Sequence, residues 1–269
     1  MTDLPPLRDI IKRYGLGARK SLGQHFLLDL NLCGRIARAA GDLSGVNVIE
    51  IGPGPGGLTR ALLDTSAQSV ITVETDHRCV EALAEVAAVH PERLKIIEAD
   101  ALDTDVAALA PAPRRIVANL PYNISTPLLL RWLEQINEFD SLTLMFQKEV
   151  AERLVAAPGS KNYGRLSIIT QWLCDVRFEF NVSNQAFTPP PKVASSIVTL
   201  TPRSEPLAPA DRKNLETVTA MAFGQRRKML RSSLKTLNLD FDALGITPTA
   251  RAEELTIEQF CAIANTITG

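Results

Sequence analysis

The fold of this chain is decided by the stretch Val48-Ile49-Glu50-Ile51-Gly52-Pro53-Gly54-Pro55-Gly56-Gly57-Leu58-Thr59. It begins with the end of an apolar run typical of a buried strand, continues with a glycine cluster, and enters a helical pattern at Leu58. Glycines let the backbone adopt positive φ angles and approach a ligand closely. A strand, a glycine loop and a helix in this order predict the first unit of an α/β sheet, with a ligand-binding site at the loop.

Strands and helices continue to alternate along the chain. The strands are predicted at residues 46–51, 69–74, 94–98, 115–118 and 142–146, and the helices at 58–63, 77–89 and 126–136. Strands separated by helices imply a mostly parallel, doubly wound sheet with right-handed crossovers. Two β-rich segments, 176–182 and 193–201, follow one another without an intervening helix, which predicts an antiparallel edge.

The regular pattern breaks at residues 202–209, where Pro, Ser, Glu and Ala replace it. Helical spacing returns in three segments, at residues 215–223, 228–237 and 257–267. We therefore expect two domains. Residues 1–205 form the α/β domain, with an N-terminal arm at 1–45, and residues 206–269 form a small all-α domain.

The composition describes an ordinary globular protein, with 45% hydrophobic and 22% charged residues among 269. No window approaches the ~18 uninterrupted apolar residues of a membrane span, and the N-terminus does not resemble a signal peptide. The four cysteines are far apart and form no C-x-x-C pair, so neither a structural zinc site nor a disulfide scaffold is expected. The sequence therefore predicts a cytoplasmic protein without membrane association or bound metal.

The net charge of −1 hides an uneven distribution. Residues 1–30 carry five Lys/Arg against three Asp/Glu, residues 31–150 carry ten against sixteen, and residues 151–269 carry fourteen against eleven. Both ends are therefore basic, while the middle is acidic. This division suits a small-molecule domain flanked by elements that touch a polyanion.

The glycine loop fits two kinds of adenosine-containing ligand. Gly52, Gly54 and Gly57 satisfy the pattern G-x-G-x-x-G. Glu74 follows Gly52 by 22 residues at a strand end, where a carboxylate can hold a ribose diol. Both a dinucleotide and S-adenosylmethionine are compatible with this arrangement.

Two details favour S-adenosylmethionine over a dinucleotide. Pro53 and Pro55 each remove a backbone N–H donor, which would weaken a cradle for pyrophosphate. Asp100 lies at the end of the third of these strands, where its carboxylate can accept a hydrogen bond from an adenine amine. The alternative interpretation, a plain connecting loop with surface acids, explains fewer of these features.

A second polar set, Asn119-Leu120-Pro121-Tyr122, follows the apolar run that ends the fourth strand. The Asn119 side-chain oxygen can accept from the exocyclic amine of a base, Tyr122 offers a stacking face, and Pro121 keeps the turn in shape. Carboxyl ends of parallel strands meet at one edge of an open α/β sheet, so this set is expected beside the adenosine-binding set. A nucleobase methyltransferase has this layout.

The chain resembles the KsgA/RsmA family, the bacterial small-subunit ribosomal RNA adenine N6,N6-dimethyltransferases. The resemblance spans nearly the whole chain in family order. Five segments carry it: Ser21-Leu22-Gly23-Gln24-His25-Phe26-Leu27, Glu50-Ile51-Gly52-Pro53-Gly54, Asn119-Leu120-Pro121-Tyr122-Asn123-Ile124-Ser125-Thr126, Phe187-Thr188-Pro189-Pro190-Pro191-Lys192-Val193 and Phe223-Gly224-Gln225-Arg226-Arg227-Lys228. The fourth-strand motif is highly specific in its extended form, whereas the glycine loop is not. Many relatives have asparagine at the position of His25.

The resemblance implies a Rossmann-like class I methyltransferase fold and S-adenosylmethionine as the methyl donor. It implies a cofactor pocket formed by His25, Leu27, Gly52, Glu74, Asp100 and Asn119. It further implies Tyr122 on one face of the target adenine and Phe187 on the other. In the expected reaction, the Asn119 oxygen and the Leu120 carbonyl accept the two N6–H bonds of adenine.

The implied target is a pair of adjacent adenines in the loop of a hairpin near the 3′ end of 16S rRNA, within the small ribosomal subunit. The implied role is in late subunit biogenesis, carried out by a monomer. The predicted RNA-binding residues, Arg226, Arg227, Lys228 and Arg231, lie on and before one expected helix, where they and Lys235 form a basic stripe. A second basic patch is expected at Lys12, Arg13, Arg19 and Lys20.

Four other functions compete with this hypothesis. Erythromycin-resistance methylases modify adenine in large-subunit rRNA, and DNA adenine methyltransferases share the chemistry but usually carry a dedicated target-recognition segment. An oxidoreductase would require NAD in the same loop. A non-catalytic assembly factor that binds the immature small subunit belongs to a different functional class, and its role can coexist with catalysis.

Overall fold

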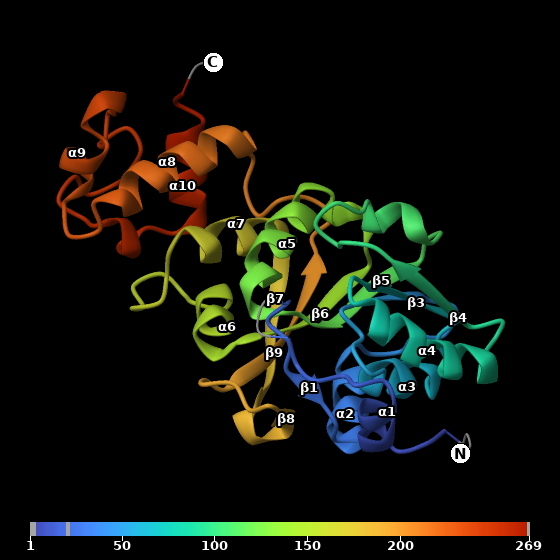
Figure 1. Ribbon diagram of the computed structural model, residues 1–269. Coiled ribbons are helices and arrows are strands. Elements are labelled where there is room, and N and C mark those ends of the chain that lie inside the picture. The colour runs from blue at the N-terminus through green and yellow to red at the C-terminus, as the bar shows by residue number, and fades with distance from the viewer. Residues whose placement is uncertain (1–3, 20–21, 268–269) are drawn as a thin grey trace. The chain divides into compact units, whose positions relative to one another are not determined.

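The computed structural model describes residues 4–19 and 22–267, so Lys20 and Ser21 lie outside the described residues. The chain forms two compact units (Figure 1). The first contains the chain up to residue 151 together with 177–202, and the second contains 152–176 and the chain from 203 onwards. The second unit therefore holds residues 152–176 in addition to the helical tail from which the sequence predicted a domain.

A seven-stranded sheet in the order β4-β3-β2-β5-β6-β9-β7 forms the centre of the first unit. Strands β2 to β6 run parallel in the register expected of a doubly wound sheet, and β9 joins β6 antiparallel. The predicted fold class is confirmed. The strands are β2 (Asn47–Ile51), β3 (Ser69–Glu74), β4 (Leu94–Glu98), β5 (Arg114–Asn119), β6 (Ser141–Gln147), β7 (Cys174–Val182) and β9 (Ser195–Pro202).

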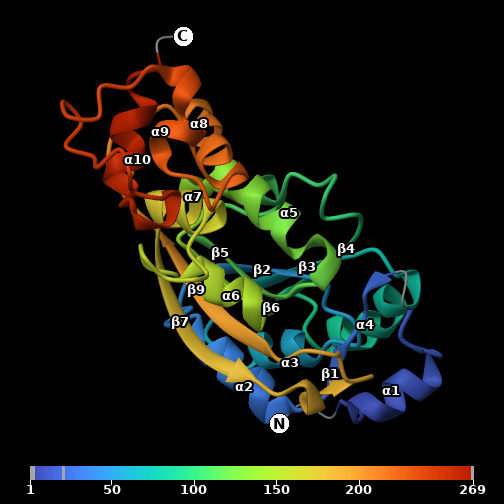
Figure 2. The ribbon, with the colours of Figure 1, turned by 90° about the vertical axis from the view of Figure 1, so that its left-hand side faces the viewer.

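Helices cover both faces of this sheet: α2 and α3 lie on one face and α5 on the other (Figure 2). Helix α5 begins four residues before the predicted start at Thr126. Pro121 precedes its first turn, and Pro127 is accommodated inside the helix. The helices of this unit are α1 (Leu7–Arg13), α2 (Leu30–Ala39), α3 (Gly57–Leu63), α4 (His77–Val89) and α5 (Tyr122–Glu134), and α6 (Lys148–Leu154) begins in this unit and ends in the second.

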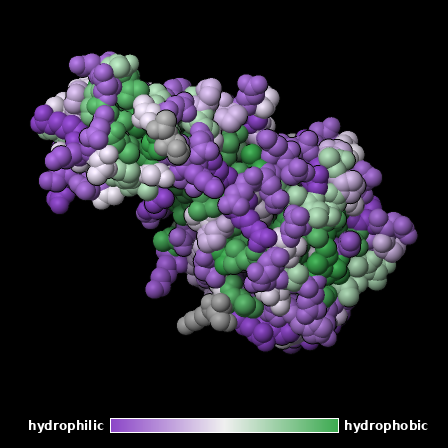
Figure 3. Space-filling model, turned by 90° about the horizontal axis from the view of Figure 1, so that it is seen from above, coloured by the Kyte–Doolittle hydropathy of each residue, from purple (hydrophilic) through white to green (hydrophobic). Residues whose placement is uncertain are grey.

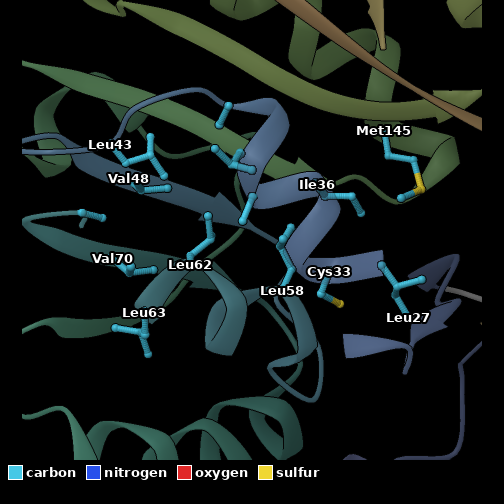
Figure 4. Close-up of a cluster of buried hydrophobic side chains, with 14 of the residues drawn as sticks. Leu27, Cys33, Ile36, Leu43, Val48, Leu58, Leu62, Leu63, Val70 and Met145 are labelled. Atoms are coloured by element: carbon cyan, nitrogen blue, oxygen red, sulfur yellow. The ribbon is translucent and has the colours of Figure 1, made fainter. Parts of the chain in front are cut away.

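The N-terminal arm is anchored in the hydrophobic core. Leu27 lies beside Cys33 of α2 in the cluster that α2 and α3 form with the sheet (Figure 4). Leu27 belongs to the short strand β1 (Phe26–Leu27), which pairs antiparallel with β8 (Phe187–Thr188), with Leu27 opposite Phe187. Burying a leucine side chain contributes about 1.5–3 kcal/mol, which keeps the arm against the sheet.

The second unit is helical and has an aromatic core. Tyr163 and Phe223 meet edge to face at 6.3 Å between ring centroids, and Phe223 stacks on Phe260 at 5.8 Å. Its helices are α7 (Arg165–Leu173), α8 (Arg212–Gly224), α9 (Leu230–Ser233) and α10 (Ile257–Ala264).

The predicted helix over residues 228–237 is wrong in extent, because α9 spans only Leu230–Ser233. The backbone around it bonds to a distant segment: Met229 bridges Arg251, and the Leu230 N–H donates to the Ala250 carbonyl at 2.8 Å. Asn238 then takes a left-handed conformation, with φ of 48°. Long-range backbone pairing therefore overrides the local helical pattern.

Across the described residues, none of the helices combines the length and the apolar character needed to cross a membrane. Figure 3 shows one face of the molecule on which hydrophilic residues surround hydrophobic ones gathered in smaller groups.

Gly57 tests the anchoring of the arm, because a Cβ at this position would lie 2.6 Å from the Leu27 carbonyl oxygen. We expect Gly57→Ala to push the arm away from α3 and to lower the free energy of unfolding by about 1–3 kcal/mol. Gly17→Ala is the control, since a Cβ there has no described neighbour within 4 Å. Thermal unfolding of both variants checks this, and equal midpoints would contradict it.

Candidate active site

A cleft lies at the carboxyl ends of four adjacent strands, in the order β4-β3-β2-β5. Gly52, Glu74, Asp100 and Asn119 line it, one from the end of each strand or the loop after it. Strand order reverses between β2 and β5, and such a switch point is where open α/β sheets bind ligands. The cleft encloses about 910 Å³ of space, which includes solvent in its open mouth.

The N-terminal arm forms one wall of this cleft. Gln24, His25 and Leu27 all line it. The Gln24 side chain donates to the Asp76 carboxylate at 2.9 Å, and Arg78 holds that carboxylate at 2.6 Å. Asp76 is buried, yet the hydrogen bonds from Arg78 lower its pKa to about 2. The hydrogen bond between Gln24 and Asp76 and the burial of Leu27 hold the arm in place on both sides of His25.

The glycine loop adopts a conformation that only glycine tolerates well. Gly52 has φ of 67° and Gly54 has φ of 55°. A Cβ on Gly54 would lie 3.1 Å from the Phe26 ring, so the arm packs directly on the loop. The Gly54 N–H donates to the Glu74 carboxylate at 3.1 Å, which ties the loop to β3.

Glu74 is a buried carboxylate held by the backbone. One of its oxygens accepts from the N–H groups of Thr75 and Asp76, both at 2.9 Å, and the other accepts from Gly54. Burial raises the pKa of Glu74, and these three hydrogen bonds oppose the rise. A carboxylate has about four acceptor positions, so the oxygen bonded to Gly54 keeps capacity for a ligand hydroxyl.

Glu50 also lines the cleft, and sequence reasoning assigned no role to it. Its side chain is 1% exposed and accepts a hydrogen bond from the Thr59 hydroxyl at 2.7 Å. Burial raises the pKa of Glu50 to about 8, and the nearby charge of Glu74 adds to the rise. The available signal was an acid inside an apolar strand, since such a residue is rarely buried without a partner or a function.

Asn119, Leu120, Pro121 and Tyr122 come together at the next strand end, and all four line the cleft. The Asn119 side chain makes no hydrogen bond within the described part of the chain, so its amide is available to a ligand. Pro121 packs 3.5 Å from where a Gly52 Cβ would stand, which brings the two predicted sets side by side. The Tyr122 hydroxyl lies 2.6 Å from the Ser195 hydroxyl.

Phe187 is not among the described residues that line the cleft. Its ring is 3% exposed and packs in the hydrophobic cluster that contains Leu27. Its predicted role as a second stacking face stays a prediction.

Residues 15–269 match the family described as Ribosomal RNA adenine dimethylase. The chain belongs to this family. It is 64% identical to the Ribosomal RNA small subunit methyltransferase A of Paramagnetospirillum magneticum, over 99% of this chain and 96% of that protein. It is 61% identical to the protein of the same name from Rhodospirillum rubrum, over 98% and 93% respectively.

Two solved structures share the fold across most of this dimethylase chain. One is a dimethyladenosine transferase from Plasmodium falciparum, with a TM-score of 0.79 and 29% identity over 89% of this chain and 96% of that one. The other is the 23S rRNA methyltransferase ErmE, with a TM-score of 0.69 and 28% identity over 90% and 98%. The fold is therefore that of S-adenosylmethionine-dependent rRNA methyltransferases.

The charge of the cleft fits S-adenosylmethionine better than a dinucleotide. Three acidic residues, Glu50, Glu74 and Asp100, line it, and none of the described lining residues is Lys or Arg. A pyrophosphate would meet uncompensated negative charge there, whereas a sulfonium and an ammonium group would be stabilised. The predicted roles of Glu74 toward the ribose and of Asp100 toward the adenine stay predictions.

The four predicted RNA-binding residues lie in the second unit and do not form one stripe. Arg226 donates to Glu253 at 3.1 Å and to the Lys161 carbonyl at 2.6 Å, so it supports the unit itself. Arg227 and Lys228 lie in the exposed turn and bend after α8, and Arg231 is exposed on α9. The predicted helical stripe is therefore wrong, because residues 227 and 228 precede α9. No cluster of His, Cys, Asp or Glu suited to a metal occurs among the described residues.

Glu50 provides a pH test. In the unfolded chain Glu50 ionises near pH 4.5, whereas in the folded protein it stays protonated up to about pH 8. Folding thus takes up a proton in this window, and the stabilising contribution of neutral Glu50 is lost as pH rises through it. Glu50→Gln keeps the neutral form, so we expect its melting temperature to gain on the wild type between pH 5 and pH 8.

Melting curves of the ligand-free protein at several pH values check this expectation. Glu92→Gln is the matched control, because Glu92 is an exposed glutamate. A constant difference between Glu50→Gln and the wild type at every pH would contradict the neutral, buried Glu50.

Proposed function

We propose that this dimethylase adds two methyl groups to N6 of each of two adjacent adenines in the 3′-terminal hairpin loop of 16S rRNA. The substrate is the small ribosomal subunit, and the reaction is a late step of its biogenesis. The observation that carries the proposal is the Asn119 amide, which has no hydrogen-bond partner among the described residues and lines the acidic cleft together with Tyr122. The enzyme acts as a monomer in the cytoplasm.

The chain's own residues orient the adenine amine. Its lone pair is delocalised into the ring, so the amine is a weak nucleophile. The Asn119 side-chain oxygen and the Leu120 carbonyl accept its two N–H bonds, which directs the lone pair into the cleft and stabilises positive charge on nitrogen. When bound, S-adenosylmethionine supplies a methyl group on positively charged sulfur. The nitrogen gains the methyl group and releases one proton to water.

Tyr122 supplies the stacking face for the base. Its ring lines the cleft directly after Pro121, and base–aromatic stacking contributes about 1–3 kcal/mol. Bases in hairpin loops can be extruded and stacked in this way, which makes a loop adenine a suitable substrate.

The small subunit is favoured over the large subunit by the relatives. Two proteins that are more than 60% identical to this chain carry the small-subunit name, whereas ErmE, a 23S rRNA methyltransferase, is 28% identical. We therefore propose the small subunit as the substrate. Incubation with methyl-labelled S-adenosylmethionine and unmethylated small subunits, followed by nucleoside analysis, tests this. Label in N6,N6-dimethyladenosine from the 3′-terminal hairpin is expected, and label only in large-subunit RNA would contradict it.

Asn119→Ala removes the side-chain acceptor of the amine. We expect kcat to fall about 100- to 1000-fold, because losing one such contact costs about 3–4 kcal/mol in the transition state. The Kd for S-adenosylmethionine should change far less. Asn31→Ala, at an exposed position of α2, is the control. Full turnover by Asn119→Ala would overturn the mechanism.

Arg226 should differ in role from its neighbours Arg227 and Lys228. Replacing both Arg227 and Lys228 with Ala should weaken rRNA binding and reduce the slope of log affinity against log salt by about 1–2. Arg226→Ala should instead lower thermal stability, because Arg226 bonds to Glu253 and Lys161. Binding titrations at several salt concentrations check this, with Lys213→Ala as the control. An unchanged slope would remove Arg227 and Lys228 from the RNA interface.

A further inference from the structure

The Tyr122 ring is contacted by side chains from two distant segments. His25, from the N-terminal arm, lies against the ring with 5.7 Å between centroids and 30° between planes. Ser195, the first residue of β9, places its hydroxyl 2.6 Å from the Tyr122 hydroxyl. One contact is on the ring and the other is at its far end, so together they limit both its tilt and its rotation.

His25 is itself fixed by the proline loop. Its Nδ1 lies 2.7 Å from the Pro189 carbonyl oxygen. A carbonyl oxygen only accepts hydrogen bonds, so Nδ1 carries the proton and donates. The imidazole therefore joins the arm, the proline loop and Tyr122 through one hydrogen bond and one ring contact.

Ser195 gives the other restraint a rigid base. Its side chain is 0% exposed, and it is paired with Gln147 at the end of β6. Burial raises the pKa of the Tyr122 phenol, while the Ser195 contact opposes the rise, so the phenol stays protonated and can take part in the bond as a donor. The phenol oxygen lies on the long axis of the ring, so the Ser195 contact fixes the direction in which the ring points, while the His25 contact limits rotation of the ring about that axis.

We propose that His25 and Ser195 are positioning residues that hold the Tyr122 ring at the angle needed to stack the target adenine. This rests on the proposed function, in which Tyr122 is the stacking face. His25 comes from the same arm that lines the cofactor cleft, so this arm both forms a wall of the cleft and orients the Tyr122 ring. Cofactor enclosure and base placement are thereby linked through His25.

The arm is also held by contacts that do not involve His25. Leu27 remains buried in the core and Gln24 remains bonded to Asp76. Because His25 is only half-buried, its replacement should leave the fold intact. An effect on base placement is then separable from a loss of structure.

Steady-state kinetics on unmethylated small subunits, with S-adenosylmethionine affinity and melting temperature measured in parallel, test the role of His25. We expect His25→Ala to raise the KM for subunits and to lower kcat/KM about 2- to 10-fold, in line with one hydrogen bond and one ring contact. His25→Phe keeps a ring without the donor and should recover part of the loss, whereas His25→Asn should recover less. His90→Ala, at the end of α4, is the control.

A double-mutant cycle tests Ser195. Tyr122→Phe and Ser195→Ala each break the same hydroxyl pair, so we expect similar losses that do not add in the double variant. Additive losses would overturn the role of Ser195. Tyr122→Phe keeps the test open if Ser195→Ala unfolds, since it removes the pair from the other side.

The failures can be told apart. If the wild type leaves small subunits unmethylated, the proposed function fails and this inference fails with it. If the wild type methylates them and His25→Ala behaves like His90→Ala, only the positioning role of His25 is overturned. A lower KM for subunits in His25→Ala would place the imidazole where the base must bind, and would overturn it as well.

Discussion

The close contact between the Leu27 carbonyl and Gly57 is the constraint on which the site depends. Gly57 is the first residue of α3, and the absence of a side chain there lets β1 cross directly over the start of the helix. The Leu27 side chain can then reach the core, while the residues before it run along the mouth of the cleft. Phe26 closes on Gly54 for the same reason. The wall of the cofactor site is therefore a consequence of backbone packing between the arm and α3.

Burial makes the acids in the cleft harder to ionise, and a cationic ligand would offset this effect. Glu50 and Glu74 are both buried, and the charge of Glu74 adds to the effect of burial in raising the pKa of Glu50. The backbone N–H groups around Glu74 favour its charged form, while Glu50 has one hydroxyl donor and stays neutral near pH 7. Glu74 is thus held as a hydrogen-bond acceptor, whereas Glu50 can ionise when a positive charge binds nearby. The positive charges of a sulfonium and an ammonium group would favour the ionised forms of these two buried acids.

Much of this site could be predicted from the sequence because its parts sit at strand ends. The bounds of β3, α4 and β4 match the predicted ranges, and Gly52, Glu74, Asp100 and Asn119 meet at one edge as the parallel sheet requires. What failed depends on contacts between distant segments. The backbone pairing of Met229 with Arg251 shortens α9. The Tyr122–Ser195 bond joins residues 73 positions apart, and no local pattern announces it.

The basic residues of the second unit show why residue type alone does not assign an interface. Arg226 and Arg227 are neighbours with the same side chain, yet Arg226 is held by Glu253 and the Lys161 carbonyl, while Arg227 lies in an exposed turn. A guanidinium that already makes two internal hydrogen bonds must break them before it can bind phosphate, which offsets the gain from the new contact. Its neighbour has no such internal bond within the described chain. The exposed turn that holds Arg227 is therefore better suited to bind phosphate than Arg226, whose guanidinium already bonds to Glu253 and the Lys161 carbonyl.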